Sequence, residues 1–550
     1  MRRAPSLLLS LAALAATAAS AAAQRETPAA LAWTRGATCY EVFVRSFQDS
    51  DGDGVGDLRG LVSRLDYIND GDPRTTGDLG ARCIWLMPIA ESPSYHGYDV
   101  TDYYRVDREY GTNDDFKRLM AEAHRRGIRV LLDMVINHAS SEHPWFQAAL
   151  RDTTSPYRAW FRWSREPGPK NQWGNSNWHR NPHRDEYYYG FFWSGMPDLN
   201  YESPAVMEEM KRVATYWIRE MGADGFRLDA VRHLYERGTQ TENVPETHGA
   251  LRAFADHVRG LAPGAFTIGE VWEPLDVLMR YYPDQLDGYF AFEVADSIVS
   301  AARSGSARGL FTPVLRLQER LPAYRWSPFL RNHDQPRART ELAGDMARAR
   351  VASFLLLTVP GLPFVYYGEE IGMTGAKPDE RLRTPMQWTA GPGAGFTTGT
   401  PWQRRADDSL THTVEAQERD PASLLALHRR LIHLRAEHPA LQSDALTPLR
   451  ASHDAVAAFV RRDGERAVLV VANLGDAPLP GVRLASPAGA LPAGPWRLRD
   501  LLGNASAAPL SVPADGAMRE YVPLPSLAPR QGYLFDLGRA IPVTKGAPQR

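Results

Sequence analysis

The stretch Gly225-Phe-Arg-Leu-Asp-Ala-Val-Arg-His233 contains a short apolar run that ends in an acidic residue, Asp229. Residues 204–221, directly before it, carry apolar side chains with a 3.6-residue period and are predicted to form a helix. Further short β-rich runs alternate with helical segments along the chain, as in repeated βα units. The eight predicted strands are residues 39–44, 83–87, 130–135, 226–228, 266–268, 288–292, 327–330 and 362–366.

Eight βα units predict a closed parallel (β/α)₈ TIM barrel, with the active site at the carboxyl ends of the strands. A doubly wound open sheet is the alternative, because periodicity does not show whether a sheet closes. A long aromatic-rich connection follows the third strand, and alternating apolar runs after residue 441 predict a C-terminal antiparallel β-sandwich. The predicted divisions are a signal peptide (1–23), the catalytic barrel in two parts (24–138 and 204–447), an inserted subdomain B (139–203) and the C-terminal β domain (448–540).

The chain has 550 residues and a formal net charge of −2, so its charge favours neither a nucleic-acid nor an anionic-membrane partner. Arg2 and Arg3 precede an apolar run that ends at Ala21-Ala22-Ala23, the pattern of an export signal. Left uncleaved, this run would be an anchor; elsewhere no apolar stretch is long enough to span a membrane. We expect an exported monomer, periplasmic or extracellular.

The only two cysteines, Cys39 and Cys83, open the first and second predicted strands. Neighbouring parallel strands could bring the two sulfur atoms together. Two cysteines do not make a disulfide scaffold. A disulfide and a pair of buried thiols therefore both fit the sequence, and buried thiols are the favoured prediction.

Three acidic residues, Asp229, Glu270 and Asp334, each follow a short apolar run. Arg227 lies two positions before Asp229, on the same face of the strand, and would keep that carboxylate ionised as a nucleophile requires. Glu270 has apolar neighbours, and burial there would raise its pKa toward that of a proton donor. Asp334 could hold substrate hydroxyls. Two carboxyls in contrasting surroundings are the minimum apparatus for cleaving a glycoside.

These segments resemble the motifs of the α-amylase superfamily, glycoside hydrolase family 13, in the family's order. Asp133-Met-Val-Ile-Asn-His138 resembles its first motif, the three acid-bearing segments its second to fourth, and Met196-Pro-Asp-Leu-Asn200 its fifth. The resemblance covers residues 33–441. It implies a retaining mechanism with the carboxyls roughly 5–5.5 Å apart. The implied catalytic roles are Asp229 as nucleophile, Glu270 as acid/base and Asp334 as transition-state stabiliser, and the implied substrate-binding residues are Tyr98, Asp99, His138, Arg227, His333 and Arg337.

The segment Asp49-Ser-Asp-Gly-Asp-Gly-Val-Gly-Asp57 places oxygen ligands at alternate positions around glycine turns. Such a loop predicts Ca²⁺, with Mg²⁺ as the alternative. It is not an EF-hand, because Gly60 stands where the bidentate Glu would be. Oligo-1,6-glucosidase-like members of the family carry a similar loop. The predicted ligands are Asp49, Asp51, Asp53, the carbonyl of Val55, and Asp57; a second site resembling that of α-amylases would use Asn137, Asp198 and the carbonyl of His233.

The specificity signals are mixed. Arg381-Leu-Arg-Thr-Pro-Met-Gln-Trp388 resembles α-glucosidases and oligo-1,6-glucosidases, whereas Arg232-His233 and Glu270-Val-Trp272 resemble α-amylases. The Met196 motif resembles the intermediary group between oligo-1,6-glucosidases and neopullulanases, and Ala230 points to α-1,4 bonds. We therefore predict an α-amylase acting on starch or maltodextrins without an organic cofactor. The alternatives are an exo-acting α-glucosidase or glucosyl transferase and, more remotely, a non-catalytic binding barrel.

Overall fold

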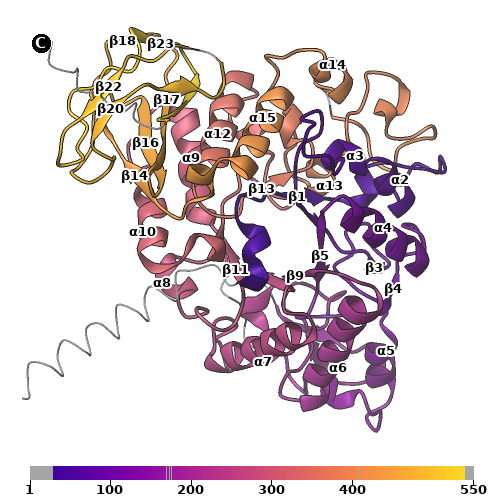
Figure 1. Ribbon diagram of the computed structural model, residues 1–550. Helices are drawn as coiled ribbons and strands as arrows, with labels where there is room; N and C mark the ends of the chain where they lie inside the picture. Colours follow the sequence, from indigo (N-terminus) through magenta and orange to yellow (C-terminus); the bar gives the residue numbers. More distant parts are fainter. Residues whose placement is uncertain are drawn as a thin grey trace, which may run out of the picture.

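A computed structural model describes residues 29–538 except 169, 172, 173, 175, 407 and 504; the predicted signal peptide lies outside the described residues. Its centre is a ring of eight parallel strands surrounded by helices (Figure 1). In spatial order the strands are β12 (Trp326–Ser327), β11 (Gly288–Phe290), β10 (Phe266–Gly269), β9 (Gly225–Leu228), β5 (Arg129–Met134), β2 (Cys83–Leu86), β1 (Cys39–Val42) and β13 (Phe364–Tyr366).

The ring closes between its first and last members, β12 and β13. The N–H of Leu362 donates to the carbonyl of Trp326 at 3.1 Å, and that of Phe364 donates to the carbonyl of Pro328 at 2.9 Å. The predicted (β/α)₈ barrel is thereby confirmed, and the doubly wound alternative is wrong. Because all eight strands are parallel, their carboxyl ends lie at the same end of the barrel. The acidic residues of the sequence motifs follow strands and lie at this end.

Amphipathic sequence patterns determine which side of each outer helix is buried, and capping residues determine where a helix begins. In α4 (Asn113–Arg125), Thr112 and Asp115 form a capping box, and Phe116 and Leu119 belong to its buried side. Among the described residues, no helix has the length and apolar character needed to cross a membrane. The other α-helices are α2 (Leu58–Ser63), α3 (Leu65–Ile68), α5 (Pro144–Arg151), α6 (Pro204–Thr215), α7 (Pro245–Leu261), α8 (Leu275–Leu278), α9 (Phe292–Ser304), α10 (Thr312–Arg320), α11 (Ala338–Glu341), α12 (Met346–Thr358), α13 (Asp379–Leu382), α14 (Val414–Glu418) and α15 (Leu424–Glu437).

The connection after β5 folds as a small unit of its own. It contains α5 and an antiparallel sheet of β6 (Trp163–Ser164), β8 (Tyr187–Tyr189) and β7 (Trp178–Arg180). Phe146 packs edge-on against Phe161 and Tyr188, with ring centroids 4.9 and 4.8 Å away. Several aromatic residues of this connection therefore pack against one another. A separate hairpin, β3 (Ala90–Glu91) with β4 (Asp102–Val106), follows β2.

The C-terminal region is an antiparallel β domain, also as predicted. Its main sheet has the order β14 (Leu446–Pro448), β16 (Val456–Asp463), β17 (Arg466–Asn473), β24 (Gly532–Asp536) and β21 (Arg499–Asp500). Three ribbons accompany it: β15 (Arg450–Ala451) with β19 (Leu484–Ala485), β18 (Leu479–Pro480) with β23 (Ser526–Leu527), and β20 (Gly494–Trp496) with β22 (Leu510–Val512). The buried Arg461 of β16 donates to the carbonyl of Thr358 at 2.7 Å, which ties this domain to the end of α12.

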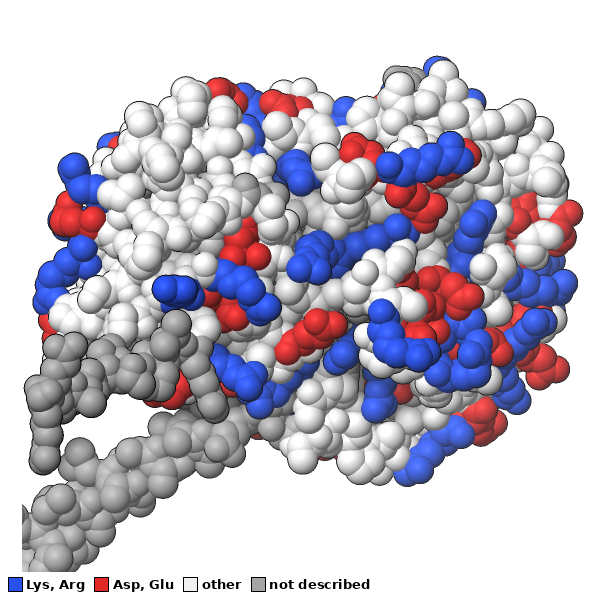
Figure 2. Space-filling view, turned by 45° about the horizontal axis from the view of Figure 1, so that its top comes forward, with Lys and Arg blue, Asp and Glu red and all other residues white. Residues whose placement is uncertain are grey.

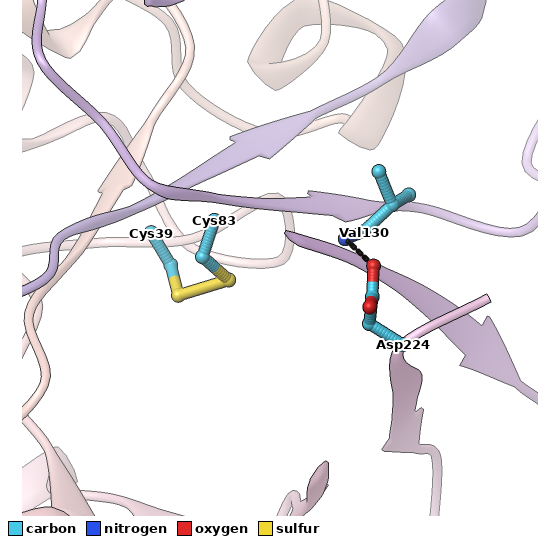
Figure 3. Close-up of a disulfide and its surroundings, with 4 residues drawn as sticks. All are labelled: Cys39, Cys83, Val130 and Asp224. Carbon is cyan, nitrogen blue, oxygen red and sulfur yellow. Dashed lines mark hydrogen bonds between the residues drawn. A yellow bond between two sulfur atoms is a disulfide. The ribbon is translucent and has the colours of Figure 1, made fainter. Parts of the chain in front are cut away.

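Cys39 and Cys83 form a disulfide (Figure 3). The favoured prediction of two buried thiols is therefore wrong. The physical reason is the strand register, since β1 and β2 pair in parallel with Cys39 directly opposite Cys83, their Cα atoms 4.3 Å apart. Nearby, Asp224, the residue before β9, accepts a hydrogen bond at 2.8 Å from the N–H of Val130 on β5, the strand that pairs with β2 (Figure 3).

Figure 2 shows basic and acidic side chains intermixed over one face of the molecule.

Candidate active site

A cavity of about 400 Å³ opens at the carboxyl ends of the barrel strands. Its size lies within the range of small-molecule sites. All three predicted catalytic residues line it, together with Tyr98 and His138. They come from segments far apart in the sequence: Asp229 follows β9, Glu270 follows β10, and Asp334 lies beyond β12. The barrel thus gathers in one cavity the three acids that the sequence singled out.

Asp229 occupies a turn that leaves strand β9. Its N–H donates to the carbonyl of Met134 at 3.3 Å, as if the strand continued by one residue. The next residue, Ala230, has a left-handed backbone conformation with φ 49°. A residue with a Cβ atom rarely adopts this conformation, and such strain is found preferentially at functional sites.

Arg227 is the fully buried centre of the site. Its Nη1 lies 2.8 Å from Asp229 Oδ1 and 2.8 Å from Asp133 Oδ1, and its Nη2 donates to Glu270. Burial alone would lower the pKa of Arg227, but the surrounding carboxylates, Asp133 first, raise it above its usual value. One permanent cation therefore holds the predicted nucleophile and the predicted acid/base in a fixed relation to each other.

Glu270 has the electrostatics of a proton donor. Its side chain is 18% exposed. Burial raises the pKa of Glu270 to about 7; Arg227 acts to lower it, and the negative charges of Asp229 and Asp334 act to raise it. A carboxylic acid with this pKa is still partly protonated near neutral pH, as general acid catalysis requires.

Asp334 is held ionised by two cations. His333 Nε2 lies 3.1 Å from Asp334 Oδ2, and Arg383 Nη2 donates to Asp334 Oδ1 at 2.9 Å. Burial opposes ionisation, but the charge of His333, its hydrogen bond and the charge of Arg383 together hold the pKa of Asp334 well below its usual range. His333 is buried, which lowers its pKa, yet Asp334 and Glu41 raise it to about 10. Glu41 Oε1 contacts His333 Nδ1 at 2.6 Å.

Tyr98 and His138 form part of the cavity wall. The Tyr98 hydroxyl lies 3.0 Å from Asp133 Oδ2 and 2.7 Å from His333 Nε2, and its ring stacks on His333 with centroids 5.8 Å apart. The buried His138 places Nε2 3.1 Å from the carbonyl of Tyr98. Burial lowers the pKa of His138, which favours its neutral form.

Asp99 and Arg337 lie outside the cavity lining. Buried Asp99 accepts hydrogen bonds from the hydroxyls of Ser92, at 2.8 Å, and Ser94. The guanidinium of Arg337 donates to the carbonyls of Leu382 and Tyr367 at 2.9 and 2.6 Å. Each side chain is thus hydrogen-bonded to the loops beside the cavity, and the substrate-binding role of both residues stays a prediction.

Sequence reasoning missed several polar members of this network. Asp133 opens the motif of residues 133–138 and Arg383 lies inside the motif of residues 381–388, but neither motif indicates that its charge belongs to this network. Glu41 is a lone acid inside an apolar strand, a signal that could have been noticed, since an unpaired buried carboxylate is costly. His96 and Asp379 also line the cavity.

The predicted metal loop brings three of its carboxylates together. Asp49, Asp51 and Asp57 each have an oxygen within 4.8 Å of the others. Asp53 is not in this group; its carboxylate accepts the N–H of Val55 at 2.7 Å. The donor set of hard oxygen atoms fits Ca²⁺ or Mg²⁺. Participation of Asp53 and of the Val55 carbonyl stays a prediction.

The second predicted metal site has buried oxygen atoms with no protein partner. Among the described residues, Asn137 Oδ1 and Asp198 Oδ2 are buried without a hydrogen bond. Burial and the nearby Glu236 raise the pKa of Asp198 well above its usual value. Buried oxygen atoms normally have a hydrogen-bond donor or a cation as partner, so this donor pair fits the predicted second metal site.

Several known proteins are similar to this chain in sequence and in structure. Residues 41–444 match the family described as "Alpha amylase, catalytic domain". The chain is 38% identical to Alpha-amylase 3 of Dictyoglomus thermophilum over 80% of its length and 85% of the relative's. It is 36% identical to the trehalose synthase/amylase TreS of Mycobacterium tuberculosis, covering 82% of this chain and 84% of that protein. The crystal structure of the α-amylase from H. orenii matches with a TM-score of 0.80 and 38% identity, over 92% of this chain and 99% of that one.

Proposed function

The chain belongs to the α-amylase family of glycoside hydrolases and transferases, and we propose that it is an exported, retaining α-glucan hydrolase that cleaves α-1,4 bonds of starch or maltodextrins. The observation that carries the proposal is the single buried guanidinium of Arg227 between Asp229 and Glu270. It joins two carboxyls with contrasting surroundings at one cavity, as glycoside cleavage requires.

The first step joins the sugar to the protein. Glu270 donates its proton to the glycosidic oxygen, the bond from that oxygen to the anomeric carbon breaks, and an Asp229 oxygen bonds to that carbon. In the second step a water oxygen attacks the same carbon, gives its proton to Glu270 and displaces Asp229. Arg227 pairs with the Asp229 carboxylate at 2.8 Å and orients it for attack, and Asp334 contributes a fixed negative charge beside the oxocarbenium-like transition state.

Cofactor, location and assembly belong to the same proposal. Asp49, Asp51 and Asp57 would hold Ca²⁺, which stabilises the loop after β1 and takes no part in bond cleavage. The Cys39–Cys83 disulfide suits an oxidising compartment, in agreement with the export signal predicted for residues 1–23. We propose a monomer located in the periplasm or outside the cell.

Early products from maltoheptaose test the proposed cleavage. Chromatography at low conversion should give a mixture of maltooligosaccharides, and NMR of fresh products should show the α-anomer first, because two displacements retain configuration. Glucose as the only product from the outset would refute endo-acting α-amylase activity. A first-formed β-anomer would refute the retaining mechanism.

An exo-acting α-glucosidase or α-glucosyl transferase is the second candidate. The similarity to the M. tuberculosis protein described as trehalose synthase/amylase supports this second candidate. These activities use the same catalytic groups and differ in which acceptor reaches the glycosyl-enzyme. Incubation with maltose alone separates transfer from hydrolysis, since a transferase or isomerising enzyme forms a new disaccharide while an α-glucosidase forms glucose. No turnover of either substrate would favour the non-catalytic alternative.

A further inference from the structure

Glu41 is a buried acid on the first barrel strand, β1, that the proposed mechanism does not use. It lies two positions after Cys39, so both side chains lie on the same face of the strand. Cys39 belongs to a cluster of buried side chains that several barrel strands contribute, which places this face inside the barrel. The Glu41 side chain is only 2% exposed. An ionised carboxylate at this depth is costly unless a positive charge pairs with it.

The partner of Glu41 is His333. Glu41 Oε1 lies 2.6 Å from His333 Nδ1, and the imidazole packs edge-on against Trp85 with ring centroids 5.5 Å apart. Trp85 is the residue of β2 directly opposite Glu41. The other ring nitrogen, Nε2, lies 3.1 Å from Asp334 Oδ2 and 2.7 Å from the Tyr98 hydroxyl. The imidazole thus connects an acid inside the barrel with an acid that lines the cavity.

The protonation state of His333 follows from these two contacts. An ionised carboxylate can only accept hydrogen bonds, so Glu41 requires a proton on Nδ1 and Asp334 requires one on Nε2. Both protons are present together only in the imidazolium form. Burial lowers the pKa of His333, but Asp334 and Glu41 raise it to about 10. His333 therefore stays positively charged through the neutral pH range.

Glu41 contributes the negative charge on the Nδ1 side of this imidazole. Arg383 donates to the carbonyl of His333 at 3.1 Å and to Asp334 Oδ1 at 2.9 Å, so two cations face the carboxylate of Asp334. The charge of Glu41 balances the second cation, and without it His333 would lose its proton at a lower pH. The titratable or charged side chains that interact with His333 are Glu41, Tyr98, Asp133, Glu270, Asp334 and Arg383.

We propose that Glu41 is a positioning residue, which holds His333 as an imidazolium and thereby fixes the carboxylate of Asp334 at the sugar-binding cavity. The inference rests on the proposed function, because it assigns Asp334 to a bound glucan. His333 is fully buried and does not line the cavity, so its effect passes through Asp334. Arg383 holds Asp334 Oδ1 and His333 holds Oδ2, so both oxygens are fixed before a sugar binds.

Glu41→Gln removes the charge and keeps the shape of the side chain. The glutamine oxygen can accept from Nδ1 of a neutral imidazole, whose Nε2 then has no proton for Asp334. The binding-competent protein is then the fraction in which His333 is still protonated. Above the lowered pKa of His333 this fraction falls about tenfold per pH unit, and the apparent affinity for sugar falls with it.

Isothermal titration calorimetry with maltoheptaose measures this effect. All variants carry Glu270→Gln, which prevents turnover and removes the titration of Glu270. This parent should bind equally at pH 7 and pH 9, whereas addition of Glu41→Gln should weaken binding about three- to tenfold at pH 9 relative to pH 7. Glu370→Gln is the matched control, a buried carboxylate that accepts from the hydroxyls of Tyr40 and Tyr67 at 2.6 and 2.7 Å, and its addition should leave binding equal at both pH values.

Heteronuclear NMR of protein labelled at its histidines reads the proton directly and needs no change at Glu41. In the wild type, one imidazole among the 15 histidines should stay protonated on both nitrogens at pH 9, and its signal should be missing in His333→Gln. A neutral His333 at pH 9 in the wild type would overturn the role of Glu41, as would identical pH dependence of binding with and without Glu41→Gln. Absence of maltoheptaose binding to the parent at either pH would instead refute the proposed function itself.

Discussion

Replacing Glu270 by Gln should abolish catalysis and, at alkaline pH, make the folded protein more stable. Glutamine keeps the shape of the side chain and an oxygen that can accept from Arg227, but it cannot ionise. In the wild type, burial raises the pKa of Glu270 from 4.5 to about 7. As pH rises between these two values, the unfolded chain releases the proton first, so the carboxyl progressively destabilises the folded state.

The magnitude follows from the pKa difference. At about 1.4 kcal/mol per pH unit, the destabilisation reaches about 1.4 kcal/mol at pH 5.5 and about 3.4 kcal/mol at pH 8. Glu270→Gln removes this destabilisation. The free energy of unfolding of the variant, relative to that of the wild type, should therefore increase by about 2 kcal/mol between pH 5.5 and pH 8. For a chain of this length, that corresponds to a change of about 2 °C in the difference between the two Tm values.

Differential scanning calorimetry of both proteins at the two pH values measures this change. Glu465→Gln is the control, an exposed carboxyl in the turn between β16 and β17. The same protonation should appear in wild-type kinetics as a fall in kcat/KM as pH rises through about 7, because Glu270 must be protonated to act as the acid. A Tm difference that does not vary with pH, combined with kcat/KM that stays level to pH 9, would refute the reasoning.

Three further predictions concern the nucleophile, the metal and the disulfide. Asp229→Asn should lower kcat by at least about 10⁴-fold without lowering Tm, because it removes the covalent step; retained turnover would contradict its role. Ca²⁺ at about 100 times its Kd should stabilise the protein by about 2.7 kcal/mol, and Asp51→Ala should abolish this gain in Tm while the control Asp66→Ala leaves it intact. Replacing Cys39 and Cys83 together by Ser should lower the free energy of unfolding by about 4 kcal/mol for their sequence separation of 44 residues, and equal denaturation midpoints for the variant and the oxidised wild type would exclude that stabilisation.

Local sequence patterns predicted the barrel and the place of its acids well. Short apolar runs alternating with helical periods identified all eight strands, although β12 is only Trp326–Ser327 where residues 327–330 were predicted. Because parallel strands of a closed barrel end on one face, acids that directly follow strands must meet there. The sequence alone therefore predicts that Asp229 and Glu270 lie close together.

Contacts between distant segments could not be predicted in this way. Glu41 and His333 are 292 residues apart in the sequence, and neither local segment contains a pattern that predicts their contact. Arg337 lies close to Asp334 in sequence, but it precedes α11, and its side chain reaches the carbonyls of other loops. The disulfide depended on the register of two strands, which alternation of residue types does not specify for strands buried on both faces.

The proton on Glu270 follows from the number of charges around Arg227 as well as from burial. Three acids, Asp133, Asp229 and Glu270, contact one guanidinium in a site with little access to water. If all three were ionised, three negative charges would surround one guanidinium, an arrangement that a buried environment disfavours. The cluster therefore retains a proton to higher pH than isolated carboxyls would, and burial likewise raises the pKa of Asp133 to about 6. Glu270, with a pKa of about 7, therefore loses its proton after Asp133 as the pH rises. The excess of carboxylates over cations in the cluster destabilises the folded protein at alkaline pH. The same excess keeps Glu270 protonated near neutral pH, and this proton is the acid for the first step of cleavage.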